Sequence, residues 1–92
     1  MLVDSNRASA EATAAIILQE QGVCEVAELD VTDFAAMRAM VKNCGKRFGR
    51  VDILHNNVGG SIPGGPEEMS VADFRSQLDL NLTSAFIGCK AV

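Results

Sequence analysis

Apolar residues along the chain switch between two kinds of spacing, and these switches predict alternating strands and helices. Short, mostly apolar runs at residues 1–4 and 51–54, and an imperfect alternation of apolar and polar residues at 24–29, have the length and composition of strands. Other stretches carry apolar residues every three or four positions, as on one face of a helix. These helical positions are Ala10, Ala14, Ile17 and Leu18, then Phe34, Met37, Val41, Cys44 and Phe48, and finally Phe74, Leu78, Leu82, Ala85 and Cys89.

Residues that start and stop helices stand at the edges of these stretches. Short polar side chains accept hydrogen bonds from the free amides of a first turn, and glycine tolerates the backbone conformation that follows a last turn. Ser70 is followed three residues later by Asp73, a variant of the capping box. We expect helices to begin at Ser5 or Asn6, at Thr32 and at Ser70, and to end at Gly22 and Gly49.

The predicted order over residues 1–92 is strand, helix, strand, helix, strand, helix. Strands that alternate with helices pair in parallel through right-handed crossovers. The pattern therefore predicts an α/β fold with a single domain, part of a doubly wound, Rossmann-like parallel sheet.

Composition narrows the classes of partner. The formal net charge is −4 and the isoelectric point about 4.7, and no cluster of Lys or Arg offers a surface to nucleic acid. Cys24, Cys44 and Cys89 are widely spaced and only one His is present, so we expect no metal site and read the cysteines as buried free thiols. No apolar stretch has membrane-spanning length, which favours a cytoplasmic protein without a membrane partner.

Four short stretches together resemble the short-chain dehydrogenase/reductase family in order and spacing. They are Leu2-Val3-Asp4, Leu29 to Asp33, His55 to Gly59, and Asn81 to Phe86. Asn56-Asn57-Val58-Gly59 looks like the family's Asn-Asn-Ala-Gly motif, with Val58 in place of alanine. The resemblance covers essentially the whole chain, from the family's second strand into its fourth helix.

The resemblance implies a cofactor role for the acidic residue at the end of the first strand. Asp4 would accept hydrogen bonds from the adenosine ribose hydroxyls and repel the extra phosphate of NADP, so NAD is the expected cofactor and NADP the less favoured one. Arg7 leaves an alternative open, because a nearby Arg sometimes accommodates a 2′-phosphate. Taken alone, Asp4 also fits a solvated turn residue that starts a helix.

Further roles follow from the same resemblance. Asp30 and the backbone amide of Val31 would contact the adenine ring, and the motif residues Asn56, Asn57, Val58 and Gly59 would bind the nicotinamide-ribose side. Asn81 would be the catalytic Asn that disturbs its helix and orders a water in the proton relay. Each has an ordinary alternative: a loop Asp, a common turn in which Asn-Asn precedes a Gly, and an Asn at the edge of an apolar stripe that reaches solvent.

The function implied is hydride transfer between an alcohol or ketone and a nicotinamide cofactor. The family's pyrophosphate-binding glycine turn would precede Met1, and its Tyr-x-x-x-Lys pair would follow Val92, so we expect the chain alone to be inactive. In the sheet order 3-2-1-4-5-6, the strands at 1–4 and 51–54 also lack their shared neighbour, which predicts partial unfolding. A homo-oligomer is expected for the full-length enzyme. The alternatives are a non-catalytic assembly module that binds a full-length relative, and a truncated product without function.

Overall fold

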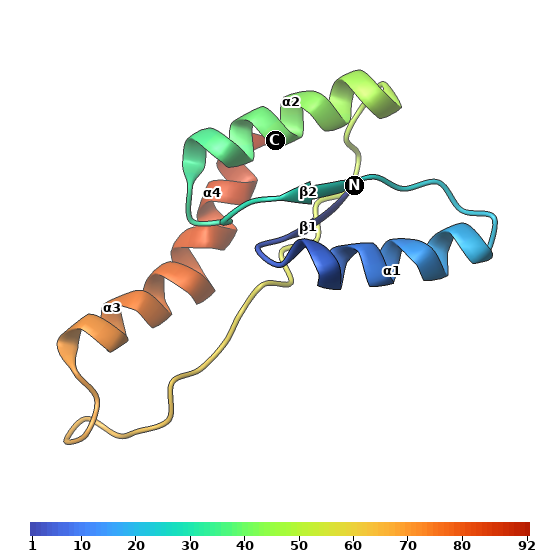
Figure 1. The fold of residues 1–92 in the computed structure, drawn as a ribbon. Helices are drawn as coiled ribbons and strands as arrows, with labels where there is room; N and C mark the ends of the chain where they lie inside the picture. The colour runs from blue at the N-terminus through green and yellow to red at the C-terminus, as the bar shows by residue number, and fades with distance from the viewer.

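The computed structural model describes residues 1–92 and has helices on both faces of a small parallel sheet (Figure 1). One helix packs along one face of the sheet, and a pair of helices that contact each other covers the other face. The α/β character expected from the alternating pattern is therefore present. The elements are β1 (Leu2–Asp4), α1 (Arg7–Gln19), β2 (Val26–Glu28), α2 (Phe34–Phe48), α3 (Val71–Leu78), the π-helical turn η1 (Asp79–Thr83) and α4 (Ser84–Ala91).

The sheet consists of β1 and β2, paired in parallel with Leu2 opposite Val26 and Asp4 opposite Glu28. The Leu2 amide donates to the carbonyl of Glu25 at 2.7 Å, and the Leu29 amide donates to the carbonyl of Asp4 at 3.1 Å. The connection between them is α1, as expected for a strand–helix–strand crossover.

The strand predicted at residues 51–54 is wrong: the segment forms no strand. No backbone–backbone hydrogen bond of the structure involves residues 50–64. An apolar run becomes a strand only when another strand satisfies its amides and carbonyls. The apolar run beginning at Val51 has no strand beside it. Its composition is that of a strand, but its backbone lacks the hydrogen bonds that would make it one.

The helix starts confirm the capping predictions in two places and correct them in a third. Asn6 caps α1 by accepting from the Ser9 amide, and Ser70 caps α3 by accepting from the Asp73 amide. The N-cap of α2 is Asp33 rather than Thr32. Thr32 is unavailable because its amide and hydroxyl both donate to the Asp30 carboxylate.

Of the two helix ends predicted at glycines, only one has the glycine in the expected conformation. Gly49, at a φ of 88°, closes α2 as expected. At the end of α1, however, the residue with positive φ is Gln21, at 62°, and not Gly22. Gly22 instead lies close against Ile17, where an added Cβ would meet the Ile17 side chain at 2.6 Å.

The last predicted helix is interrupted. Its apolar stripe runs through α3, η1 and α4, and the π-helical turn η1 inserts an extra residue between the two α-helical parts. Such insertions are rare and frequently mark functional sites. Asn81 lies inside this turn.

The core is small for a chain of this length. The buried apolar residues are Ala10, Met37, Met40 and Ile87. The radius of gyration of 15.2 Å exceeds the value of about 12 Å expected for a compact domain of 92 residues. All three cysteines are free, but none is fully buried, and Cys89 is exposed, so the expectation of buried thiols is wrong.

Helix length and hydropathy also bear on membrane insertion. None of the helices combines the length and the apolar composition needed to cross a bilayer.

Gly88 allows α4 to lie directly against the extended segment at residues 51–58, which precedes the glycine-rich loop at residues 59–66. A Cβ at Gly88 would overlap Oδ1 of Asn56 and would lie 3.4 Å from Cδ2 of Leu54. The Asn56 amide in turn donates to Sγ of Cys89, the next residue of α4, at 3.6 Å. The absence of a side chain at Gly88 thus fixes where Asn56 sits.

Replacing Gly88 with alanine is therefore expected to turn the Asn56 side chain away and break its hydrogen bond to Cys89. The Asn56 side-chain amide signals should move in a nitrogen–proton correlation NMR spectrum. Gly45→Ala is the matched control, because a Cβ there meets nothing within 4 Å and alanine is favoured over glycine inside a helix by about 0.5–1 kcal/mol. The control should slow hydrogen exchange in α2 and leave Asn56 in place. Unmoved Asn56 signals in the Gly88→Ala chain would contradict this account.

Candidate cofactor-binding site

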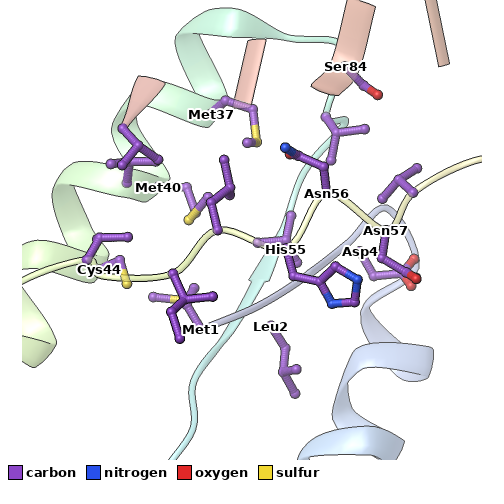
Figure 2. A pocket seen from close by; sticks show the side chains of 18 residues that line it. Met1, Leu2, Asp4, Met37, Met40, Cys44, His55, Asn56, Asn57 and Ser84 are labelled. Atoms are coloured by element: carbon purple, nitrogen blue, oxygen red, sulfur yellow. The ribbon is translucent and has the colours of Figure 1, made fainter. Parts of the chain in front are cut away.

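A cavity of about 580 Å³ lies between β1, α2 and the extended segment 51–58. Figure 2 shows that it has two different ends: Asp4 and Asn57 lie at one, and Met1 and Cys44 at the other. The polar end coincides with the last residue of β1 and with the end of the extended segment. In open α/β sheets, ligands bind outside the carboxyl ends of the strands, so the polar end is the candidate site.

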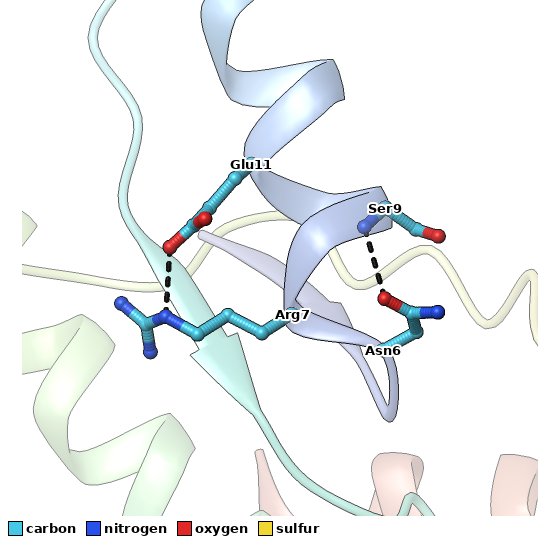
Figure 3. Close-up of polar contacts among 4 residues, drawn as sticks. All are labelled: Asn6, Arg7, Ser9 and Glu11. Atoms are coloured by element: carbon cyan, nitrogen blue, oxygen red, sulfur yellow. Dashed lines mark hydrogen bonds and ion pairs between the residues drawn. The ribbon is translucent and has the colours of Figure 1, made fainter.

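Asp4 is held in place by the start of α1. Its Oδ1 accepts from the amide of Asn6 at 2.8 Å, whereas Oδ2 has no hydrogen-bond partner within the protein. Arg7 does not neutralise it, because the Arg7 guanidinium pairs with Glu11 at 2.7 Å one turn along α1 (Figure 3). The carboxylate is thus fixed in orientation and keeps one oxygen for a ligand.

Asp30 and Val31 follow β2 in the turn that leads into α2. Oδ1 of Asp30 accepts from the backbone amide of Thr32 at 2.8 Å and from its hydroxyl at 2.7 Å. These two hydrogen bonds, the backbone one first, lower the pKa of Asp30 below its ordinary value. The stability that these hydrogen bonds contribute is fully present above the ordinary pKa of an aspartate and is lost as the pH falls through the lowered pKa of Asp30.

Val31 contributes a backbone donor next to the polar end. Its side chain lines the cavity, and its amide makes no hydrogen bond within the protein. A free amide beside a cavity is a site to which a ligand acceptor can bind.

The residues after Leu54 alternate in direction, as in an extended backbone. In Figure 2, Asn56 points toward Ser84 on α4, whereas His55 points to the opposite side of the segment. Asn56, Asn57 and Val58 all line the cavity. Only Asn56 is anchored to a neighbouring element, by its hydrogen bond to Cys89.

Asn81 ties the glycine-rich loop to the π-helical turn. Its Nδ2 donates to the carbonyl of Gly60 and to the carbonyl of Gln77, both at 2.8 Å, and its Oδ1 accepts from the Gly60 amide at 3.0 Å. Gly59 makes room for this contact, because a Cβ there would lie 2.9 Å from Oδ1 of Asn81. The side chain of Asn81 is therefore a clamp on the loop, and its geometry requires glycine at position 59.

The structure brings most, but not all, of the predicted residues to one cavity. Those that line it are Asp4, Val31, Asn56, Asn57 and Val58. Asp30 does not line this cavity, but the next residue, Val31, does. Asn81 lines a second cavity of about 590 Å³ between the glycine-rich loop and α3, together with Gln77 and Phe74. Gly59 and Gly60, which follow Val58 of the first cavity in sequence, contact Asn81 of the second.

Two contributing residues escape the reasoning from sequence. Gln77 accepts from the Ile62 amide at 3.1 Å and so adds a second anchor for the loop. The sequence held one indication of this role: Gln77 precedes Asn81 by four residues, which places both side chains on the same face of a helix. Ser84 is buried and lines the first cavity, with its hydroxyl donating to the Leu80 carbonyl at 2.5 Å, and nothing in the periodicity distinguishes it from a surface serine.

Comparison with known proteins finds one family throughout the chain. The family model described as short chain dehydrogenase matches residues 1–92. D-threitol dehydrogenase of Mycolicibacterium smegmatis is 38% identical over 90 residues, which cover 98% of this chain and 35% of that protein. Glucose 1-dehydrogenase 2 of Bacillus subtilis is 33% identical over 88 residues, covering 95% of this chain and 34% of the relative. The chain thus spans about a third of the length of these relatives.

Solved structures agree in fold. A short-chain dehydrogenase/reductase from Burkholderia xenovorans superposes with a TM-score of 0.94 at 44% identity, over 98% of this chain and 36% of the other. A gluconate 5-dehydrogenase from Burkholderia cenocepacia, in complex with NADP and tartrate, gives 0.86 at 27% identity, over 99% of this chain and 36% of the other. The Rossmann-like fold expected from the sequence is confirmed, and the chain belongs to the short-chain dehydrogenase family.

Proposed function

We propose that this chain forms the adenosine side and part of the nicotinamide side of a cofactor site in an NAD-dependent dehydrogenase. The observation that carries the proposal is the shared lining of one cavity by Asp4, Val31 and the Asn56–Val58 stretch. The complete enzyme would transfer a hydride between an alcohol or ketone carbon and the cofactor, whose nicotinamide ring supplies the hydride chemistry. The three free cysteines favour a reducing, cytoplasmic location.

The residues at the polar end fit the chemistry of a dinucleotide. The unpartnered oxygen of Asp4 suits a ribose hydroxyl, which donates a hydrogen bond to it. The free amide of Val31 and the charged Asp30 suit the edge of an adenine ring, which offers both acceptors and a donor. By its clamp on Gly60, Asn81 holds the loop after Gly59 in place, which favours a role for this residue near the reacting end of the cofactor.

Asp4 also favours NAD over NADP. A 2′-phosphate would bring about two negative charges next to a carboxylate, and the nearest cation in sequence, Arg7, is already paired with Glu11. The relatives do not decide this point, since the structurally similar gluconate 5-dehydrogenase holds NADP. The preference therefore depends on the carboxylate of Asp4 in this chain.

Titration of the chain with NAD and with NADP, followed by NMR, tests this proposal. NAD should shift the backbone amide signals of Asp4 and Val31 with weak affinity, and NADP should bind about tenfold more weakly because like charges repel. Asp4→Asn should abolish this difference. Glu20→Gln is the matched control, because it removes the same charge from the exposed end of α1 and should preserve the difference. Equal binding of the two cofactors to the parent chain, or no shift at all with NAD, would refute the assignment.

An assembly role is a second candidate, favoured by one observation. The final helical stretch exposes large apolar side chains that no other element covers: Val71, Phe74, Leu78, Leu82 and Phe86 are 42–66% exposed. These residues follow the apolar stripe through α3, η1 and α4. Contiguous exposed apolar surface commonly marks a protein–protein contact, and we propose a homo-oligomer contact here.

Sedimentation velocity at increasing concentrations tests the assembly role. Leu82→Glu should shift the distribution toward monomer, since it places a charge in the centre of the stripe. Ile16→Glu is the control, because Ile16 is an exposed apolar residue of α1, outside the stripe, and this change should leave the distribution as in the parent. The same distribution in the Leu82→Glu and parent chains would exclude α3–α4 as the contact.

A further inference from the structure

The π-helical turn η1 changes which backbone amide pairs with which carbonyl. In an α-helix, the amide of Ser84 would donate to the carbonyl of Leu80, four residues earlier. Here it donates to the carbonyl of Asp79, five residues earlier. The Leu80 carbonyl thereby loses its α-helical donor, and a carbonyl that is left without a partner inside a protein is destabilising.

The side chain of Ser84 supplies the missing donor. Its hydroxyl donates to the Leu80 carbonyl, so this one residue gives its amide to Asp79 and its hydroxyl to Leu80. Ser84 is the one buried polar residue of the chain, at 6% exposure. Because water has little access to this position, the hydroxyl is the donor on which the Leu80 carbonyl depends.

The neighbouring hydroxyl of the turn has a different partner. Oγ1 of Thr83 donates to Oδ1 of Asp79 at 3.1 Å, a contact between two side chains on the surface. Thr83 therefore leaves the Leu80 carbonyl to Ser84. The two hydroxyls belong to consecutive residues, and only that of Ser84 bonds to the backbone of the turn.

The helix that follows the turn is fixed to the core. Ile87 of α4 is buried together with Met37 and Met40 of α2. Gly88 lies against Asn56, where an added Cβ would overlap Oδ1 of Asn56. Since α4 is held on both sides, the residues before it take the direction that the turn gives them.

Asn81 depends on that direction. One residue more or less in a helix rotates the preceding side chains by about 100°. With the π-helical turn, the Asn81 side chain holds both the amide of Gly60, at 3.0 Å, and its carbonyl, at 2.8 Å. The Leu80 side chain lies against the same glycine, since a Cβ at Gly60 would be 3.3 Å from Cδ2 of Leu80. A turn that relaxed toward α-helical pairing would rotate Asn81 away from Gly60.

We infer that Ser84 is a positioning residue, which acts through the π-helical turn to hold Asn81 against the glycine-rich loop without a hydrogen bond to Asn81 itself. The inference rests on the proposed function, in which Asn81 lies near the reacting end of the cofactor. Ser84 also lines the first cavity, where Asn56 points toward it (Figure 2). The same residue thus borders the first cavity and supports the residue that lines the second.

Hydrogen exchange at the Gly60 amide, measured by NMR on the 92-residue chain, tests this role. Ser84→Ala leaves the Leu80 carbonyl without its donor, so exchange at Gly60 should become about tenfold faster. The side-chain amide signals of Asn81 should shift in the same variant. Ser84→Thr keeps a hydroxyl that can reach the carbonyl four residues earlier, and it should restore both the slow exchange and the parent signals.

Thr83→Val is the matched control. It removes a hydroxyl of similar size from the adjacent residue, one that bonds only to the Asp79 side chain, and the two residue types have similar helix propensity. Gly60 exchange and the Asn81 signals should stay as in the parent. The Leu29 amide, which donates to the Asp4 carbonyl at 3.1 Å, reports on the sheet and should keep its exchange rate in every variant.

Four outcomes would overturn the inference. Parent-like exchange at Gly60 in Ser84→Ala would show that the turn does not need the hydroxyl. Equal acceleration at Gly60 and Leu29 would assign Ser84 to general stability, and fast exchange in Ser84→Thr would deny the rescue. Ser84→Cys has a similar volume but a weak donor and should behave as Ser84→Ala, so parent-like exchange there would assign the role to packing. None of these readouts involves NAD, so their failure is distinguishable from failure of the cofactor titration.

Discussion

The pairing of backbone amides and carbonyls decides which parts of this chain form a sheet and a core, more than the apolar character of its side chains does. Apolar residues are abundant, yet few are buried, because the sheet that should collect them has only two short strands. Where pairing exists, between β1 and β2, helices pack on both faces. Where it is missing, along residues 51–54, an equally apolar sequence stays extended and partly exposed. Helix packing depends on a sheet surface, and the sheet surface depends on completed backbone pairing.

Elements whose stability is local could be predicted from the sequence, and those that need a distant partner could not. Each helix carries its own hydrogen bonds and its own caps, so α1, α2 and the final helical stretch lie where the apolar spacing placed them. The N-cap at Asp33 was missed because Asp30 competes for Thr32 in the same turn. The strand at 51–54 was predicted wrongly for another reason: apolar spacing and composition indicate that a segment is suited to burial, whereas a strand forms only when a neighbouring strand pairs with its backbone.

The candidate site shows the same division. Asp4 and Asn57 could be placed at the same end of the fold, since both follow runs that were expected to be parallel strands, although only the run before Asp4 forms one. The contact between Asn81 and Gly60 could not be derived from spacing, because it depends on how a loop of irregular backbone folds against a helix. The π-helical turn was likewise invisible in the pattern: inserting one residue shifts the stripe by about 100°, which the apolar positions on either side tolerate.

The residues that hold the polar end in shape also hold the neighbouring helices in place, and this couples stability to the chemistry of the site. The turn at Asp4 and Asn6 orients a carboxylate and starts α1 with consecutive hydrogen bonds. The turn at Asp30 lowers the pKa of that carboxylate through hydrogen bonds from Thr32 and leaves Asp33 to start α2. In both turns one carboxylate oxygen is occupied by the protein's own amides, so a ligand meets an acceptor that is already oriented. Preorganised acceptors reduce the cost of ordering on binding. This preorganisation supports the proposed cofactor role of the polar end.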